Sequence, residues 1–148
     1  MILKLNEDGT VERVECSDES VWNVCRKELD GGFLEPVYLP FGFVMMVDED
    51  GYCKQLKVNP TATLLYDILF HAEHFILGKC CFARVDGEYF VGLSESHARG
   101  LEGFLAELRK QSAAMTIPNE IPPPNVSIES FDTVEELFER LTPKRGAR

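Results

Sequence analysis

The chain has 148 residues, of which 25 are acidic and 15 are basic, and its formal net charge is −10 at pH 7. A chain of this length forms one domain and buries roughly 68–70% of the surface that its unfolded form exposes, so it folds without disulfide or metal staples. The acidic balance opposes binding to nucleic acid, and no apolar stretch approaches the roughly 20 residues of a bilayer crossing.

Cysteine usage and the N-terminal sequence predict a cytoplasmic protein. No basic segment precedes an apolar one at Met1, as it would in a secretory signal. The cysteines are odd in number and lack CxxC spacing, which favours reduced core residues over a disulfide framework. They are Cys16, Cys25, Cys53, Cys80 and Cys81.

Residues 1–16 predict a first β-hairpin, because the turn-forming sequence at 6–9 separates two short strands. These strands are partly charged, which is typical of the edge of a sheet. Residues 18–29 predict a helix that ends at Gly31-Gly32. Its apolar stripe consists of Val21, Trp22, Cys25 and Leu29.

Residues 33–40 predict an extended segment, in which Pro36 removes a ladder hydrogen bond and so favours an edge strand or a bulge. Residues 43–58 predict a second long hairpin around an acidic turn at 48–51. The pattern leaves open whether this loop has two or four residues, and therefore which residues pair across it. A calcium loop of the EF-hand type is excluded, because the further oxygen ligands that it needs are missing.

Asn59 and Pro60 predict the start of a helix that runs towards Phe75, with Asn59 as its N-cap. Helical spacing gathers apolar residues on one broad face of this helix. The opposite side holds a polar and aromatic set, which consists of Asp67, His71 and His74, flanked by Tyr66 and Phe70.

This set supports two hypotheses. Asp67, His71 and His74 stand at i, i+4 and i+7, so one helix face would offer two imidazoles and a carboxylate to a zinc or iron ion. A solvated polar helix face explains the same spacing without a metal. Tyr66 and Phe70 predict a partner-binding surface, unless residues 33–40 or a C-terminal helix cover them.

Residues 75–93 predict the central hairpin of the sheet, with Asp86 and Gly87 in a type I′ turn and Val85 opposite Glu88. Apolar residues on both faces favour an interior strand pair that is covered on each side. One face carries Cys80, Phe82, Val91 and Leu93, and the other carries Cys81, Ala83, Val85 and Phe90. We therefore interpret this hairpin as scaffold and its cysteines as packing groups.

Ser94 predicts the N-cap of a helix that continues to about Lys110, with an i,i+4 ion pair between Glu95 and Arg99. We expect its buried side to consist of Leu101, Phe104, Leu105 and Leu108. Gly100 and Gly103 would weaken this helix, and we expect another element to pack closely against them.

The sequence thus predicts an α+β fold, in which helices pack on a mainly antiparallel sheet built from hairpins. The α+β core domain spans residues 1–111, and residues 112–125 form a proline-rich linker. Residues 126–148 predict a short strand and an amphipathic helix, which would dock on the core or on a partner. The basic residues that follow, at 144–148, are expected to be solvated.

Short motifs across residues 29–101 resemble those of a protein family. Their order is GGFLEPVYL, VMMVDEDG, NPTA, FILGKC and YFVGLSE. This order is similar to a bacterial and phage family known as domain of unknown function three thousand eight hundred and forty-six. The resemblance covers about half of the chain and implies a small protein of phages or mobile elements. That family has no assigned reaction, so it implies no catalytic residues.

No nucleophile elbow, phosphate-binding loop or dinucleotide-binding glycine pattern is present in the sequence. We expect a cytoplasmic accessory protein without its own catalysis or cofactor, whose partner is another protein or a second copy of the chain. Two alternatives from other classes stay open. One is a small metal-dependent enzyme that uses Asp67, His71 and His74, and the other is an acidic mimic of DNA that blocks a DNA-binding protein.

Overall fold

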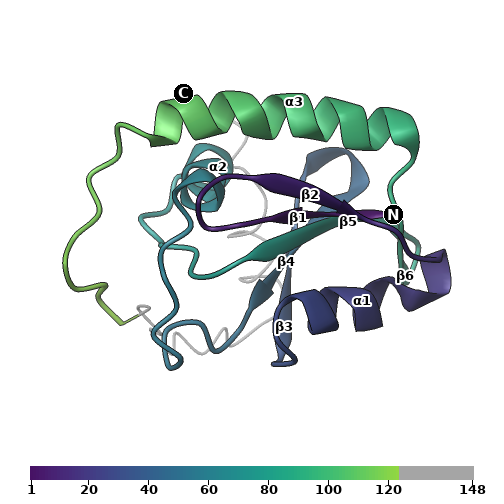
Figure 1. Cartoon of the computed structure of the whole chain (residues 1–148), viewed down its shortest axis with the longest axis horizontal. Coiled ribbons are helices and arrows are strands. Elements are labelled where there is room, and N and C mark those ends of the chain that lie inside the picture. Colours follow the sequence, from purple (N-terminus) through teal and green to yellow (C-terminus); the bar gives the residue numbers. More distant parts are fainter. Residues whose placement is uncertain (124–148) are drawn as a thin grey trace, which may run out of the picture.

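The computed structural model describes residues 1–123 and has an α+β architecture, as predicted (Figure 1). Six strands form one antiparallel sheet in the order β2-β1-β5-β4-β3, and β6 pairs with β5. In chain order the elements are β1 (Ile2–Leu5), β2 (Val11–Val14), η1 (Asp18–Ser20), α1 (Val21–Glu28), β3 (Leu34–Tyr38), η2 (Pro40–Gly42), β4 (Phe43–Asp48), α2 (Pro60–Phe70), β5 (Cys80–Asp86), β6 (Tyr89–Val91) and α3 (Glu95–Ser112).

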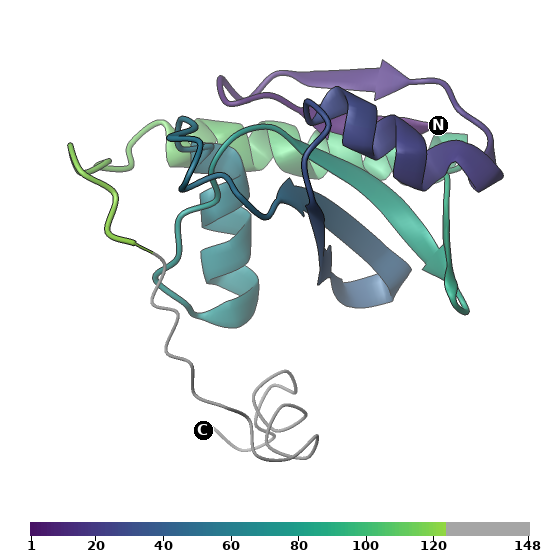
Figure 2. The ribbon, with the colours of Figure 1, turned by 90° about the horizontal axis from the view of Figure 1, so that it is seen from below.

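Helices cover both faces of the sheet, so the domain has two hydrophobic cores (Figure 1). α2 and α3 cover one face, where Leu65 and Leu105 pack in the same core as Phe82. α1 covers the opposite face, where Val21 packs in the same core as Ala83. The view in Figure 2 places α1 in the foreground and α3 behind the sheet.

β5 is the interior strand that the sequence predicts. Cys80 and Phe82 belong to the core under α2 and α3, whereas Cys81 and Ala83 belong to the core over α1. All four side chains are fully buried. The alternation of apolar residues on both faces therefore results from a strand that is covered on each side.

The predicted register of the central hairpin is wrong by two residues. Asp86 pairs with Tyr89 and Val85 with Phe90, so the turn consists of Gly87 and Glu88. Gly87 has a φ of 61°, whereas Asp86 stays in the strand. A shift of two residues keeps every side chain on its predicted face, because the side-chain period of a strand is two.

The predicted hairpin of residues 43–58 is also wrong. β4 pairs with β3 on one side and with β5 on the other, so neither side of β4 is free for residues 52–58. After Asp48 the chain instead forms a series of turns. After these turns, Val58 forms an isolated antiparallel β-bridge with Leu77. A sequence pattern cannot show that both edges of a strand are already occupied.

The expectation for Pro36 is confirmed, because β3 is an edge strand. Hydrogen bonds from Leu39 N to Phe43 O and from Glu49 N to Phe33 O join the odd-numbered residues of this segment to β4. Strand alternation then places Pro36 on the free side of β3, where its missing N–H leaves no donor at the centre of the edge.

The helix predicted from Asn59 to Phe75 is shorter than expected. α2 ends at Phe70, and His71 adopts the left-handed conformation with a φ of 50°. Ile76 is buried, its N–H donates to Thr63 Oγ1, and its carbonyl accepts from Asn59 N. These bonds bring residues 75–77 back along the start of α2, which a longer helix would prevent.

α3 begins as predicted, with the Ser94 hydroxyl accepting from His97 N, and it extends two residues beyond Lys110. Leu101, Leu105 and Leu108 are buried, but Phe104 is 46% exposed, contrary to expectation. The expected close packing against Gly100 and Gly103 is also wrong, because both glycines face open space. α3 packs on the sheet through a narrower stripe than the apolar pattern indicates.

The predicted strand and helix of residues 126–148 lie outside the described residues. Within residues 1–123, no helix is both long and apolar enough to cross a membrane.

Asn59 joins three separate parts of the chain, although it is fully buried. Its Oδ1 accepts from Ala62 N at 3.1 Å, which caps α2. Its Nδ2 donates to Leu5 O at the end of β1 and to Gly78 O before β5. Every polar atom of this side chain therefore has a protein partner, as a buried amide requires.

Asn59→Ala is expected to lower the free energy of unfolding by about 3 kcal/mol, because it removes the helix cap and leaves buried backbone groups without partners. Urea unfolding followed by the fluorescence of Trp22, the only tryptophan, measures this loss. Asn23→Ala, an exposed change on α1, serves as the control and should stay within about 0.5 kcal/mol of the parent. Equal effects of the two changes would contradict the role of Asn59.

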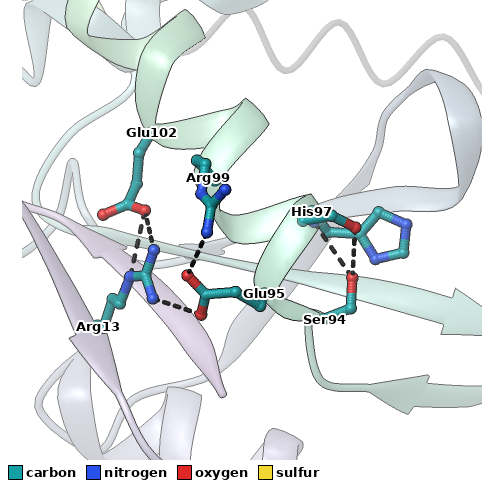
Figure 3. A network of polar contacts seen from close by, with 7 residues as sticks. Arg13, Ser94, Glu95, His97, Arg99 and Glu102 are labelled. Atoms are coloured by element: carbon teal, nitrogen blue, oxygen red, sulfur yellow. Dashed lines mark hydrogen bonds and ion pairs between the residues drawn. The ribbon is translucent and has the colours of Figure 1, made fainter.

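A network of ion pairs joins the edge strand β2 to α3 (Figure 3). Arg13 donates to Glu95 Oε2 at 2.7 Å and to Glu102 Oε1 at 2.6 Å. Glu95 Oε1 also accepts from Arg99 at 3.5 Å, which confirms the predicted i,i+4 pair. The hydrogen bond from Arg13 is the main cause that lowers the pKa of the Glu95 carboxyl below its ordinary value of 4.5.

Arg13→Ala is expected to lower the urea midpoint modestly at neutral pH. Because the pKa of Glu95 is lowered in the folded state, its contribution is present above the ordinary glutamate value and is lost as the pH falls through the lowered value. The difference between parent and variant should therefore shrink in acid, and also in high salt. A difference that stays constant under both conditions would contradict an electrostatic role for this network.

Candidate functional site

The described residues enclose a cavity of about 960 Å³, which we call the acidic groove. Its walls are the turns after β4, the start of β3, the side of α2 and residues 73–77, which lead from α2 towards β5. Ile121, Pro122 and Pro123 line it as well. Five segments of the chain thus meet at one site.

Asp48 shapes the turn that forms one wall of the acidic groove. Its carboxylate is almost fully buried, accepting from Asp50 N at 2.9 Å and from Lys54 Nζ at 2.7 Å. Gly51 is buried next to Leu77, whose Cβ would lie 3.1 Å from a Cβ added at this glycine. The turn therefore depends on the Asp48 hydrogen bonds and on the small size of Gly51.

Five carboxylates line the acidic groove, namely Glu35, Asp48, Glu49, Asp50 and Glu73. Lys54 pairs with Asp48. Across residues 1–123, the other four carboxylates have no ion-pair partner within 4 Å. Within residues 1–123 the negative charge of the groove is therefore largely uncompensated, and it favours a cationic ligand.

Aromatic side chains also line the acidic groove. The Tyr66 ring lies 4.7 Å from the Phe70 ring and 5.4 Å from the His74 ring, measured between centroids. Tyr66, His74, Phe75 and Tyr52 line the groove. Burial and, to a smaller extent, the negative charge of Glu35 raise the pKa of the Tyr66 hydroxyl. A groove lined by both aromatic rings and carboxylates suits a ligand with both cationic and apolar parts.

The structure places Tyr66, one of the two predicted partner-binding residues, in the acidic groove and the other, Phe70, against its ring. Tyr66 lines the acidic groove, and Phe70 packs against the Tyr66 ring from the last turn of α2. Both side chains are half-buried, whereas the sequence interpretation requires exposure. The two rings pack against each other and do not form an exposed aromatic patch.

The three residues of the metal hypothesis are not arranged as predicted. Asp67 lies on α2 and His71 at its C-cap, both exposed, whereas His74 lies beyond the end of the helix in the acidic groove. In the part of the chain that the structure describes, no three His, Cys, Asp or Glu side chains are placed to hold a metal ion. The metal assignment stays a prediction without a geometric site.

The cysteines behave mainly as packing groups. Burial raises the pKa of the Cys80 thiol, and a hydrogen bond with Cys25 together with burial raises that of Cys81. Raised values oppose formation of the reactive thiolate. Among the described residues all five cysteines are free, and Cys53 is exposed in the acidic groove.

Sequence reasoning missed most of this site. The acidic run at 48–50 predicts only a hairpin turn, and no sequence pattern marks Glu35 or Glu73 as site residues. The sequence does contain the residues of this site, because an acidic run at 48–50 precedes the N-cap Asn59 and aromatic residues at 66 and 75 follow it. The pattern does not show that they converge, because convergence depends on how α2 and β4 pack.

No protein-family model matches the chain, and no curated protein or solved structure matches it either. The resemblance to domain of unknown function three thousand eight hundred and forty-six therefore stays a prediction. The fold and the site themselves define an α+β protein with an acidic, aromatic-lined groove at one end of its sheet.

The raised pKa of Tyr66 gives a direct check on the geometry of the groove. Tyr66→Phe is expected to remove a phenolate titration step that lies above the ordinary tyrosine value of 10.0. Glu35→Gln should lower this step by a smaller amount, because burial is the larger cause and the like charge the smaller one. Phenolate absorbance measures both effects. A lost titration step that lies at or below 10.0 would contradict the half-buried position of this ring.

Proposed function

We propose that the protein is a non-catalytic binding module, whose acidic groove accepts a basic peptide segment of a partner protein. The observation that supports this proposal is that one groove combines aromatic rings with four carboxylates that have no ion-pair partner among residues 1–123, namely Glu35, Glu49, Asp50 and Glu73. Such a site attracts Lys or Arg side chains through charge and packs their aliphatic stems against rings.

Electrostatic attraction and apolar packing would both contribute to the binding free energy. Each exposed ion pair contributes about 0.2–1 kcal/mol, so charge alone gives weak affinity and mainly speeds association. The rings of Tyr66, Tyr52 and Phe75 offer apolar area to the peptide, including any proline residues in it. A basic segment that also contains proline or apolar residues fits both walls.

The two alternative functions have less support. A metal-dependent enzyme would need Asp67, His71 and His74 at one site, and the end of α2 separates His74 from the helix that carries the other two. A mimic of DNA would present its carboxylates on a convex face, whereas these carboxylates line a hollow. We infer an accessory protein of the cytoplasm, in keeping with its free thiols, and the family resemblance suggests a mobile element as its source.

The proposal predicts that the protein binds a fluorescein-labelled peptide of alternating Arg and Pro residues at low ionic strength. A groove variant, Glu49→Gln/Asp50→Asn/Glu73→Gln, should bind it about tenfold more weakly, because three ion pairs are lost. Fluorescence anisotropy measures the dissociation constants. A peptide with Glu in place of Arg should not bind.

A matched control variant removes three carboxylates that lie outside the groove, Glu15→Gln/Glu19→Gln/Glu88→Gln, all of them exposed. Its net charge equals that of the groove variant, and its affinity should stay within about twofold of the parent. Equal losses in the two variants would mean that the peptide senses only net charge, and the proposed function would then be wrong.

A further inference from the structure

The acidic groove lies where the described part of the chain ends. After α3, residues 113–123 run along one end of the molecule towards the turns that follow β4 (Figure 1). The last three of these residues, Ile121, Pro122 and Pro123, line the groove. The remaining 25 residues of the sequence therefore start at the site itself.

The end of the sequence carries the charge that the groove lacks. Residues 140–148 contain four cationic side chains, Arg140, Lys144, Arg145 and Arg148, and neither Asp nor Glu. No other nine-residue stretch of this sequence is as basic. The same stretch includes Leu141 and Pro143, which suit an aromatic wall. It has the chemistry of the basic segment that the proposed function requires.

Chain length and effective concentration both favour binding of this segment to the groove. Arg140 follows Pro123 by 17 residues, so it can lie up to about 60 Å from the point where the chain leaves the groove. Binding within one chain does not depend on protein concentration, and a tether raises the effective concentration of its end. Ion pairs that are individually weak are then sufficient for segment 140–148 to occupy the groove.

We propose that the groove of the free protein holds the basic segment 140–148 of its own chain, which a basic segment of the partner displaces. This inference rests on the proposed function and adds regulation to it. Affinity for the partner is reduced by the fraction of molecules in which the groove is already filled. A partner with more cations, or with better contacts to Tyr66, overcomes this competition.

The test uses the full chain and the Arg-Pro peptide as the probe. The tail variant Lys144→Gln/Arg145→Gln/Arg148→Gln is expected to bind the probe roughly fivefold more tightly than the parent, because the competing segment is weakened. The control variant Arg26→Gln/Lys27→Gln/Lys110→Gln has the same net charge and changes exposed residues outside the groove. It should bind the probe within about twofold of the parent.

The outcomes separate this inference from the proposed function. Equal affinities of the tail and control variants would overturn occupation by the tail, while binding that still depends on Glu49, Asp50 and Glu73 would leave the proposed function intact. If those three carboxylates make no difference, the proposed function fails as well. An affinity of the parent that falls with rising protein concentration would mean that the tail of a second copy fills the groove, which also contradicts binding within one chain.

Cys53 permits a direct measurement, because its thiol is exposed in the groove. With Gly146→Cys, a diamide oxidant that accepts two electrons and two protons should form a disulfide between residues 53 and 146 of one chain. Peptide mapping by mass spectrometry identifies the bond. The rate should fall several-fold when Glu49, Asp50 and Glu73 are neutralised as above. A rate that does not change would overturn the inference.

Discussion

The fold depends on one buried amide. Asn59 caps α2 through its Oδ1, and its Nδ2 binds the carbonyls of Leu5 and Gly78, which belong to β1 and to the approach to β5. These partners fix where α2 starts relative to the sheet. The backbone N–H of Asn59 also donates to Ile76 O, which returns residues 75–77 to the helix. The wall of the groove formed by His74 and Phe75 follows from this return.

The position of β4 has a second consequence for the site. Because β3 and β5 occupy both of its edges, the chain that follows Asp48 cannot extend the sheet and forms turns. The buried carboxylate of Asp48 and the small Gly51 hold these turns against Leu77. Glu49 and Asp50 thereby line the same groove as Glu35 and Glu73. A paired strand in place of these turns would leave no groove.

Much of the fold follows from local chemistry. Ser94 and Asn59 are N-caps in the sequence and in the structure, because their side chains satisfy free N–H groups of the first helical turn. Pro36 indicates an edge strand, and the apolar alternation of residues 80–83 indicates a strand with two covered faces. The incorrect predictions concern strand pairing and helix length. They are the register of the hairpin at Gly87, the strand that pairs with β4, and the residue at which α2 ends. Each of these depends on residues distant in sequence.

The sequence by itself determined the α+β class, the interior position of β5, the helix caps and the acidic balance, because these depend on side-chain periodicity, capping chemistry and composition. It also marked Tyr66 and Phe70 as unusual. Only the tertiary structure decided that Tyr66, His74 and five carboxylates share one groove, and that His74 leaves the helix of Asp67. The physical reason is that long-range contacts of Asn59, Gly51 and Ile76 set the paths of these segments, and no local pattern records such contacts.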